Sequence, residues 1–174
     1  MPGNPTAARL FLTGDLMCAR GIDQILPHPG DPRLYEAYVK DAGDYVRLAE
    51  RRNGAIAQPV DFAYVWGMVL EALRQRRPDV RLVNLETAVT GNGWPLPKGI
   101  NYRMNPANLP VLEVAGIDCC VLANNHVLDW GEAGLGAVFV FTGGHSAFIE
   151  WRTRFGHAFL DEQLLALGWR IELP

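Results

Sequence analysis

A layered α/β fold with a parallel or mixed central sheet is the fold class that this sequence predicts. Short apolar runs at residues 9–13, 80–83 and 118–123 have the length of buried strands, and each ends abruptly in polar residues. A helical pattern of apolar positions separates the first run from the second. With 174 residues, 49% of them hydrophobic, the chain is long enough to form one domain with a substantial core.

The charge of the chain restricts its class of partner, and its cysteines restrict the kinds of site it can form. Sixteen basic and nineteen acidic residues give a net charge of −3, so no basic field predicts a nucleic acid or an anionic membrane as partner. The three cysteines, Cys18, Cys119 and Cys120, have neither zinc-site nor disulfide spacing, and we interpret them as small buried apolar residues.

The first residues of the chain predict its location. Residues 1–9 have no signal-peptide pattern, and no apolar run reaches transmembrane length. We therefore expect a cytoplasmic protein without a membrane segment. If an N-terminal anchor precedes this sequence, a membrane-associated or extracellular location is expected instead.

The first strand leads directly into Gly14 and Asp15, which would present a carboxylate at the edge of the sheet with little obstruction. The alternative is that Asp15 caps a short helix. Arg20 follows on the same turn, and two interpretations stay open for it: it holds a phosphate, or it pairs with Asp23.

The segment between the first and second strands is predicted to be partly helical. Proline and glycine make residues 27–59 irregular, with one helix over 41–52. Apolar residues at helical spacing predict a second helix over 61–77 that covers the sheet. The next strand then ends in Asn84 and Glu86.

After a Gly/Pro-rich loop at 91–99, a short strand is expected at 101–104, and Asn105 and Pro106 are typical of the start of a helix that runs to about residue 115. Strands that alternate with helices predict right-handed βαβ crossovers.

The third strand leads into Asn124, Asn125, His126 and, three residues later, Asp129. Parallel strands bring their carboxyl ends to one edge, so Asp15, Glu86 and Asn125 should lie within roughly 5 to 10 Å of one another. Such ligands suit a divalent metal, which would polarise a phosphoryl oxygen. His126 could then donate a proton, and Asp129 could fix the tautomer of its ring.

The alternative for these residues has no ligand. Asp15 and Asn125 would each bond local backbone in separate turns, and Glu86 would be solvated on a surface loop.

Three ordered motifs carry a family resemblance: TGDLMCAR at 13–20, NLET at 84–87 and LANNHVLDWG at 122–131. Together with residues 102–104 and 115–118, they resemble the CapA family, the poly-γ-glutamate capsule biosynthesis proteins related to calcineurin-like metallophosphoesterases. The match covers roughly residues 9–136.

The resemblance implies a layered α/β metallophosphatase fold with Asp15, Glu86 and Asn125 as metal ligands and His126 as the catalytic histidine. Arg20 and Asn124 are then the candidate substrate-binding residues, and Asp129 supports His126.

The chain departs from the family pattern in two places. Met17 stands where phosphoesterases have the histidine of Asp-x-His, and a thioether is a poor ligand for a hard metal, so one metal site would be weakened or absent. The metal could be Mn, Fe, Zn or Mg. Residues 137–174 form a divergent tail whose His145 and His157 do not match the family's later histidine motifs. We interpret the chain as a domain over 1–136 followed by this tail, with truncation and a frame change both left open.

Two functions of different classes follow. The first is a CapA-type, metal-dependent phosphoesterase-like hydrolase linked to capsule polymer synthesis, which acts on a phosphorylated small molecule or an acidic polymer. The second is a non-catalytic accessory protein that keeps the fold and binds a polymer or a partner protein. An open sheet edge would also favour a homo-oligomer.

Overall fold

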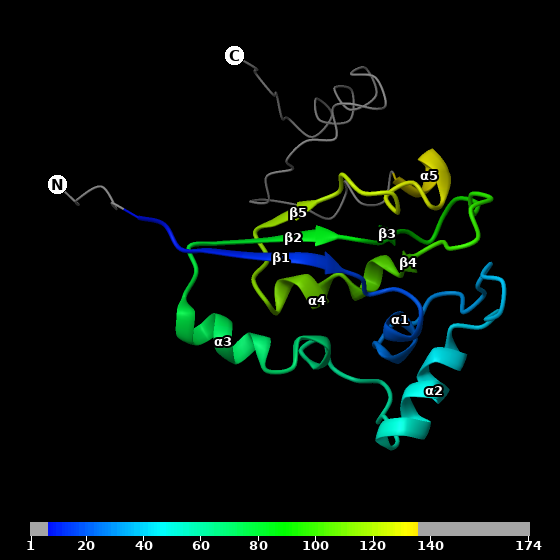
Figure 1. Cartoon of the computed structure of the whole chain (residues 1–174), viewed down its shortest axis with the longest axis horizontal. Helices are drawn as coiled ribbons and strands as arrows, with labels where there is room; N and C mark the ends of the chain where they lie inside the picture. Colours follow the sequence, from blue (N-terminus) through cyan, green and yellow to red (C-terminus); the bar gives the residue numbers. More distant parts are fainter. Residues whose placement is uncertain (1–6, 136–174) are drawn as a thin grey trace, which may run out of the picture.

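A computed structural model describes residues 7–135 of the chain (Figure 1). Its main sheet contains three parallel strands in the order β1 (Leu10–Leu16), β2 (Val80–Leu85) and β5 (Cys119–Val121). The parallel α/β sheet predicted from the sequence is confirmed. The predictions for the tail at 137–174, including His145 and His157, lie outside the described residues.

Helices surround this sheet. In Figure 1, α3 (Val69–Arg76) and α4 (Pro110–Glu113) lie along one side of the strands. Beyond the carboxyl ends lie α1 (Gly21–Ile25) and α2 (Gly43–Asn53), which contact each other, and α5 (Gly131–Leu135) follows the third strand. Among the described residues, no helix combines the length and the apolar character needed to cross a bilayer.

The core lies between the sheet and these helices. Val83 of β2, Leu73 of α3 and Val111 of α4 belong to one buried cluster with Met104. Burial of such side chains is the main term that stabilises the domain. Cys18 and Cys119 are buried as expected, and burial raises the pKa of the Cys18 thiol to about 12, as suits an unreactive core residue.

The first strand is longer than predicted. Its pairing with β2 shifts register between Thr13 and Asp15, and β1 continues to Leu16. Asp15 is therefore inside the strand rather than the first residue after it. The alternative role of Asp15 as a helix cap is wrong, because Arg20 occupies the N-cap position of α1.

The single helix predicted over 61–77 is wrong in its extent. A short 3-10 helix, η1 (Tyr64–Trp66), is separated from α3 by Gly67, whose φ of 49° lies in the left-handed region and interrupts the helix. The break allows the buried indole of Trp66 to donate to the carbonyl oxygen of Val111 at 2.7 Å. This bond ties η1 to α4.

The predicted helix up to residue 115 is also divided, into η2 (Pro106–Asn108) and α4. Asn105 does cap its start, because its side chain accepts from the amide of Ala107 at 3.0 Å. The strand expected near 101–104 is β4 (Arg103–Met104), which pairs in parallel with β3 (Ala88–Val89) in a separate two-stranded sheet.

Asp23 joins the irregular segment after α1 to the segment that precedes α4. Its carboxylate, on a residue only 3% exposed, accepts from the amides of Gly30 at 2.8 Å and Asn105 at 2.9 Å. It also accepts from the side-chain amide of Asn108 at 2.8 Å. The alternative pairing of Asp23 with Arg20 is therefore wrong.

Replacing Asp23 should destabilise the fold. Asp23→Ala would remove the acceptor of three donors, one buried and two partly buried, and we expect a loss of about 2–4 kcal/mol of unfolding free energy. Urea unfolding followed by circular dichroism measures this change. As a control, Glu71→Ala removes an exposed carboxylate on α3 and should leave the unfolding free energy close to that of the wild type. Equal losses in the two variants would contradict the role given to Asp23.

Candidate functional site

The candidate site is at the carboxyl ends of the strands, and the side chain of Asn84 lies at its centre. Its amide nitrogen donates to Asp15 Oδ1 at 2.7 Å and to Glu86 Oε2 at 2.6 Å. Its carbonyl oxygen accepts from the amide of Asn124 at 2.9 Å. One carboxamide thus joins β1, the end of β2 and the loop after β5, and it brings two predicted metal ligands to a common point.

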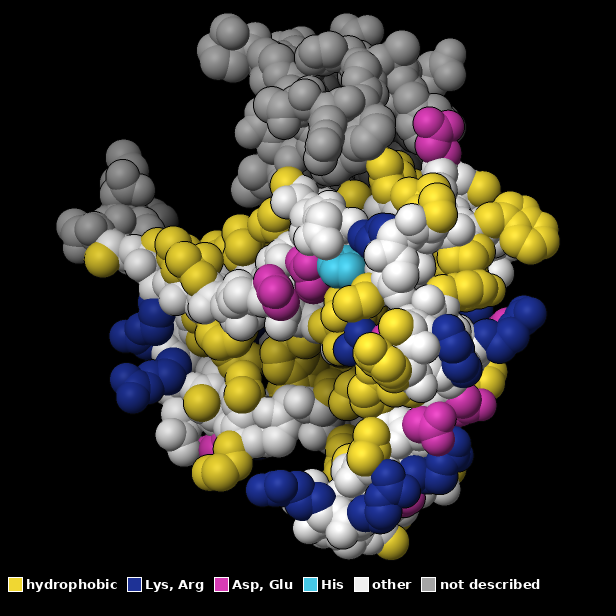
Figure 2. Space-filling view, turned by 45° about the vertical axis from the view of Figure 1, so that its right-hand side comes forward, with side chains coloured by type: hydrophobic (Ala, Val, Ile, Leu, Met, Phe, Trp, Pro, Cys, Tyr) yellow, Lys and Arg dark blue, Asp and Glu magenta, His cyan; other side chains and the backbone are white. Residues whose placement is uncertain are grey.

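His126 faces this carboxylate pair. Its Nε2 lies 3.8 Å from Glu86 Oε1, and its Nδ1 lies 2.7 Å from Asp129 Oδ2. The ring of Tyr102 stacks on the imidazole at a centroid distance of 4.0 Å. Figure 2 shows a histidine next to acidic side chains on one face of the molecule. The imidazole is thus held on one nitrogen and on one ring face, while its other nitrogen points toward a carboxylate.

Asp129 is 0% exposed and has three partners. Besides His126, its carboxylate accepts from the backbone amide of Tyr102 at 2.5 Å and pairs with Lys98 Nζ at 2.5 Å. Lys98 also donates to the carbonyl oxygen of Asn125 at 2.6 Å. Because a buried carboxylate needs such partners, Lys98 and Tyr102 determine where Asp129 holds the imidazole.

The side chain of Arg20 contacts other side chains of the same chain. Its Nε lies 2.6 Å from Glu36 Oε1. Its guanidinium carbon lies 4.8 Å from the ring centre of Tyr102 and 5.0 Å from that of Tyr45. Arg20 therefore lies beside the ring that supports His126, and its predicted contact with substrate stays a prediction.

The two neighbouring asparagines have different surroundings. Asn124 donates to Asn84 and to the carbonyl oxygen of Leu85, and its Oδ1 accepts from the amide of His126 at 3.0 Å. Asn125 is exposed, and only its backbone oxygen has a partner among the described residues. Asn124 thus shapes the loop, whereas the structure does not bring the side chain of Asn125 to the carboxylate pair.

These residues fit a divalent metal in part. Asp15 and Glu86 offer two hard oxygen ligands that converge on one donor, and His126 Nε2 lies beside them. Over residues 7–135, however, no group of three or more histidine, cysteine, aspartate or glutamate side chains has the arrangement of a complete metal site. A metal would need further ligands, such as Asn125 in another rotamer.

Three residues at the site were missed by sequence reasoning. Asn84 belongs to the NLET motif and Tyr102 to the segment at 102–104 that shares the family resemblance, but the sequence assigned neither a role, and Lys98 was only a loop residue. The role of Asn84 depends on its place opposite Asp15 in two parallel strands, a register that the sequence does not fix. Lys98 carried no comparable signal.

A parallel α/β sheet that gathers carboxylates and an Asn-His pair at its carboxyl edge defines a chain of the metallophosphoesterase-like fold. The model of one family within that fold, described as "Bacterial capsule synthesis protein PGA_cap", matches residues 9–139. The chain belongs to this family.

Two curated relatives support the assignment. They come from two strains of Mycobacterium tuberculosis and are described as probable polyglutamine synthesis accessory proteins. Each is 51% identical over 136 residues, which are 78% of this chain and 36% of the relative. The chain thus spans about a third of the length of these relatives. The family match at residues 9–139 contains the whole candidate site.

The adjacent asparagines provide a matched test of the site's architecture. Asn124→Ala removes two hydrogen bonds that join the loop to β2 and one within the loop, and we expect it to lower the unfolding free energy by about 2 kcal/mol. Asn125→Ala removes an exposed side chain and should stay within about 0.5 kcal/mol of the wild type. Thermal and urea unfolding measure both changes. Losses of the same size would show that Asn124 does not join the loop to the sheet.

Proposed function

We propose that this chain provides the metal-binding half of a phosphoesterase-like site in a protein that takes part in the synthesis of an anionic capsule polymer. Its substrate is a phosphorylated small molecule or a phosphorylated precursor of the polymer. The observation that carries the proposal is the convergence of Asp15 and Glu86 on Asn84, with His126 beside Glu86. The link to capsule polymer synthesis rests on the family and on the names of its relatives.

The roles of the residues follow from their contacts. Asp15 and Glu86 would hold a divalent metal such as Mn, Fe, Zn or Mg, with Asn125 as a further ligand. When bound, the metal supplies charge that polarises a phosphoryl oxygen and lowers the pKa of water. Asn84 holds the two carboxylates at a fixed separation, because both accept from its amide nitrogen.

His126 is the candidate proton donor to the leaving oxygen. Asp129 accepts from Nδ1 if that nitrogen carries the hydrogen, and this leaves Nε2 as the nitrogen that faces the site. Tyr102 covers one face of the ring and excludes water from it. These contacts orient the imidazole before substrate arrives, which is the arrangement that proton transfer requires.

A second function is favoured by specific observations. Met17 replaces a nitrogen ligand, and Asn84 already occupies lone pairs of both carboxylates. Both features weaken metal binding, and the curated relatives are described as accessory proteins. The alternative is a non-catalytic member that retains the fold and binds an acidic polymer or a partner protein.

Metal binding is tested first, by calorimetry with Mn²⁺ on the full chain. Asp15→Asn and Glu86→Gln should each lower the affinity by about ten-fold or more, because each removes a charged oxygen ligand. Glu71→Gln changes an exposed carboxylate on α3 and should leave the affinity unchanged. If the intact chain has no affinity for Mn²⁺, or if the control lowers it as much as the two ligand variants do, the metal site is wrong.

Hydrolysis separates the two functions. The phosphoesterase function predicts release of nitrophenol from a generic phosphodiester, lost on addition of a chelator and reduced by His126→Ala by about a hundred-fold. The accessory function predicts no turnover with or without added metal. Turnover that survives both chelation and His126→Ala would contradict a metal-dependent reaction at this edge.

A further inference from the structure

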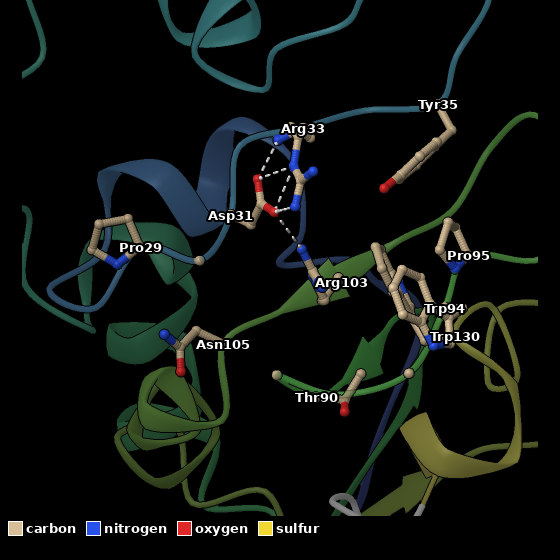
Figure 3. Close-up of a pocket in the computed structure, with 13 residues that line it drawn as sticks. Pro29, Asp31, Arg33, Tyr35, Thr90, Trp94, Pro95, Arg103, Asn105 and Trp130 are labelled. Carbon is tan, nitrogen blue, oxygen red and sulfur yellow. Dashed lines mark hydrogen bonds and ion pairs between the residues drawn. The ribbon is translucent and has the colours of Figure 1, made fainter.

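A second pocket lies on the other side of the segment that carries Tyr102. It has a volume of about 520 Å³, within the range of small-molecule sites. Its walls come from the segment after α1, the Gly/Pro-rich loop after β3, β4 and the residue before α5, and the argument below uses Asp31, Arg33, Tyr35, Trp94, Arg103 and Trp130 (Figure 3). Nothing in the proposed phosphoesterase site uses these residues.

Arg103 is the most unusual group in this pocket. Its guanidinium carbon lies 3.7 Å from the ring centre of Trp130, and its side chain is only 16% exposed. Its closest carboxylate oxygen, on Asp31, is also 3.7 Å away, too far for a hydrogen bond. Among the described residues Arg103 makes no side-chain hydrogen bond, and burial lowers its pKa. Within residues 7–135, a guanidinium with five donors thus has a long ion pair with Asp31 but no hydrogen-bond acceptor.

Asp31 does not neutralise Arg103, because its carboxylate is engaged elsewhere. Arg33 donates to both of its oxygens, from Nε at 2.8 Å to Oδ2 and at 3.1 Å to Oδ1, and this contact lowers the pKa of Asp31 to about 2. Asp31 therefore stays ionised at neutral pH. Asp31 is thus paired mainly with Arg33, and Asp23, which also acts on Arg103, is already engaged by the amides of Gly30 and Asn105. The donors of Arg103 therefore stay available for an anion that enters the pocket.

The opposite side of the pocket is aromatic. Figure 3 shows Tyr35 and Trp94 on the side away from Asp31, and both are exposed, Trp94 to 86%. The backbone before Trp94 passes close to Trp130, because Gly93 has a φ of 88° and any Cβ there would collide with the carbonyl oxygen of Trp130. The exposed indole of Trp94 provides a flat apolar surface for a ligand.

Polar groups complete the lining. The side-chain nitrogen of Asn105 has no partner among the described residues, and the Asp31 carboxylate has lone pairs beyond those used by Arg33. Donors and acceptors together suit the hydroxyls of a sugar, whose ring carbons can pack on an aromatic face. A flexible carboxylate chain would not need the flat surface of Trp94.

We propose that this pocket binds an acidic sugar residue, with the sugar carboxylate on Arg103 and one face of the ring on Trp94. The site goes beyond the proposed phosphoesterase function and shares no side chain with it. Its ligand class is a uronic acid or an oligosaccharide that contains one.

The experiment is calorimetry on the full chain with a short oligosaccharide of alternating glucuronate and N-acetylglucosamine. We expect binding that weakens as salt rises, and no binding of a neutral N-acetylglucosamine oligosaccharide of the same length. Trp94→Ala and Arg103→Met should each lower the affinity by about ten-fold or more. Arg47→Met, which removes an exposed arginine on α2, should leave it unchanged.

Four results would overturn the proposal: no binding of the acidic oligosaccharide, equal binding of the neutral one, stronger binding of a glutamate oligomer, or full affinity in Trp94→Ala. Trp94 is exposed, so its replacement tests the pocket even if Arg103→Met fails to fold. The Asp15→Asn variant should bind the sugar like the wild type, and a loss there would also contradict a separate site. The calorimetry with Mn²⁺ tests the proposed phosphoesterase site, and its outcome does not depend on any of these sugar-binding results.

Discussion

The site depends on one side chain, the carboxamide of Asn84. Its nitrogen holds Asp15 of β1 and Glu86 at the end of β2, and its oxygen accepts from Asn124 after β5. The backbone hydrogen bonds of the sheet fix the spacing of the strands, but they do not fix the side chains at their ends. Asn84 fixes them, since an amide supplies two donors for two carboxylates and an acceptor for the third strand. Without it, two anions at this edge would repel each other with no donor between them.

Asp129 plays the corresponding role for the imidazole. The carboxylate is fully buried, and its partners are a ring nitrogen, a backbone amide and the ammonium of Lys98. Since an isolated buried charge is costly, each partner is required for the others to keep their positions. Lys98 comes from the exposed Gly/Pro-rich loop, so this loop helps to determine the geometry of His126. The positions of the side chains at the site therefore depend on residues well outside the three sequence motifs.

Much of this arrangement could be predicted from the sequence, because apolar strands that end in polar residues lead to a parallel sheet with one polar edge. That reasoning brings Asp15 and Glu86 together and places Asp129 beside His126. It could not provide the register shift after Thr13, which moves Asp15 into the strand, or the central place of Asn84. It also missed the helix break at Gly67, because the apolar pattern continues across it while the backbone enters the left-handed region. Side-chain pairing and local backbone conformation depend on tertiary contacts, which the spacing of apolar residues along the sequence does not predict.

The two sites are built on opposite sides of the same two backbone segments. Tyr102 and Asp129 face His126, while their chain neighbours Arg103 and Trp130 line the second pocket. The indole of Trp130 donates to the carbonyl oxygen of Tyr102 at 3.1 Å, and the amide of Tyr102 donates to Asp129, so the segments are joined on both sides. The two members of each pair thus contact different sites, and this separates the acidic edge from the second pocket within a few residues. The same two segments thus carry the residues of the proposed metal site on one side and those of the proposed sugar pocket on the other.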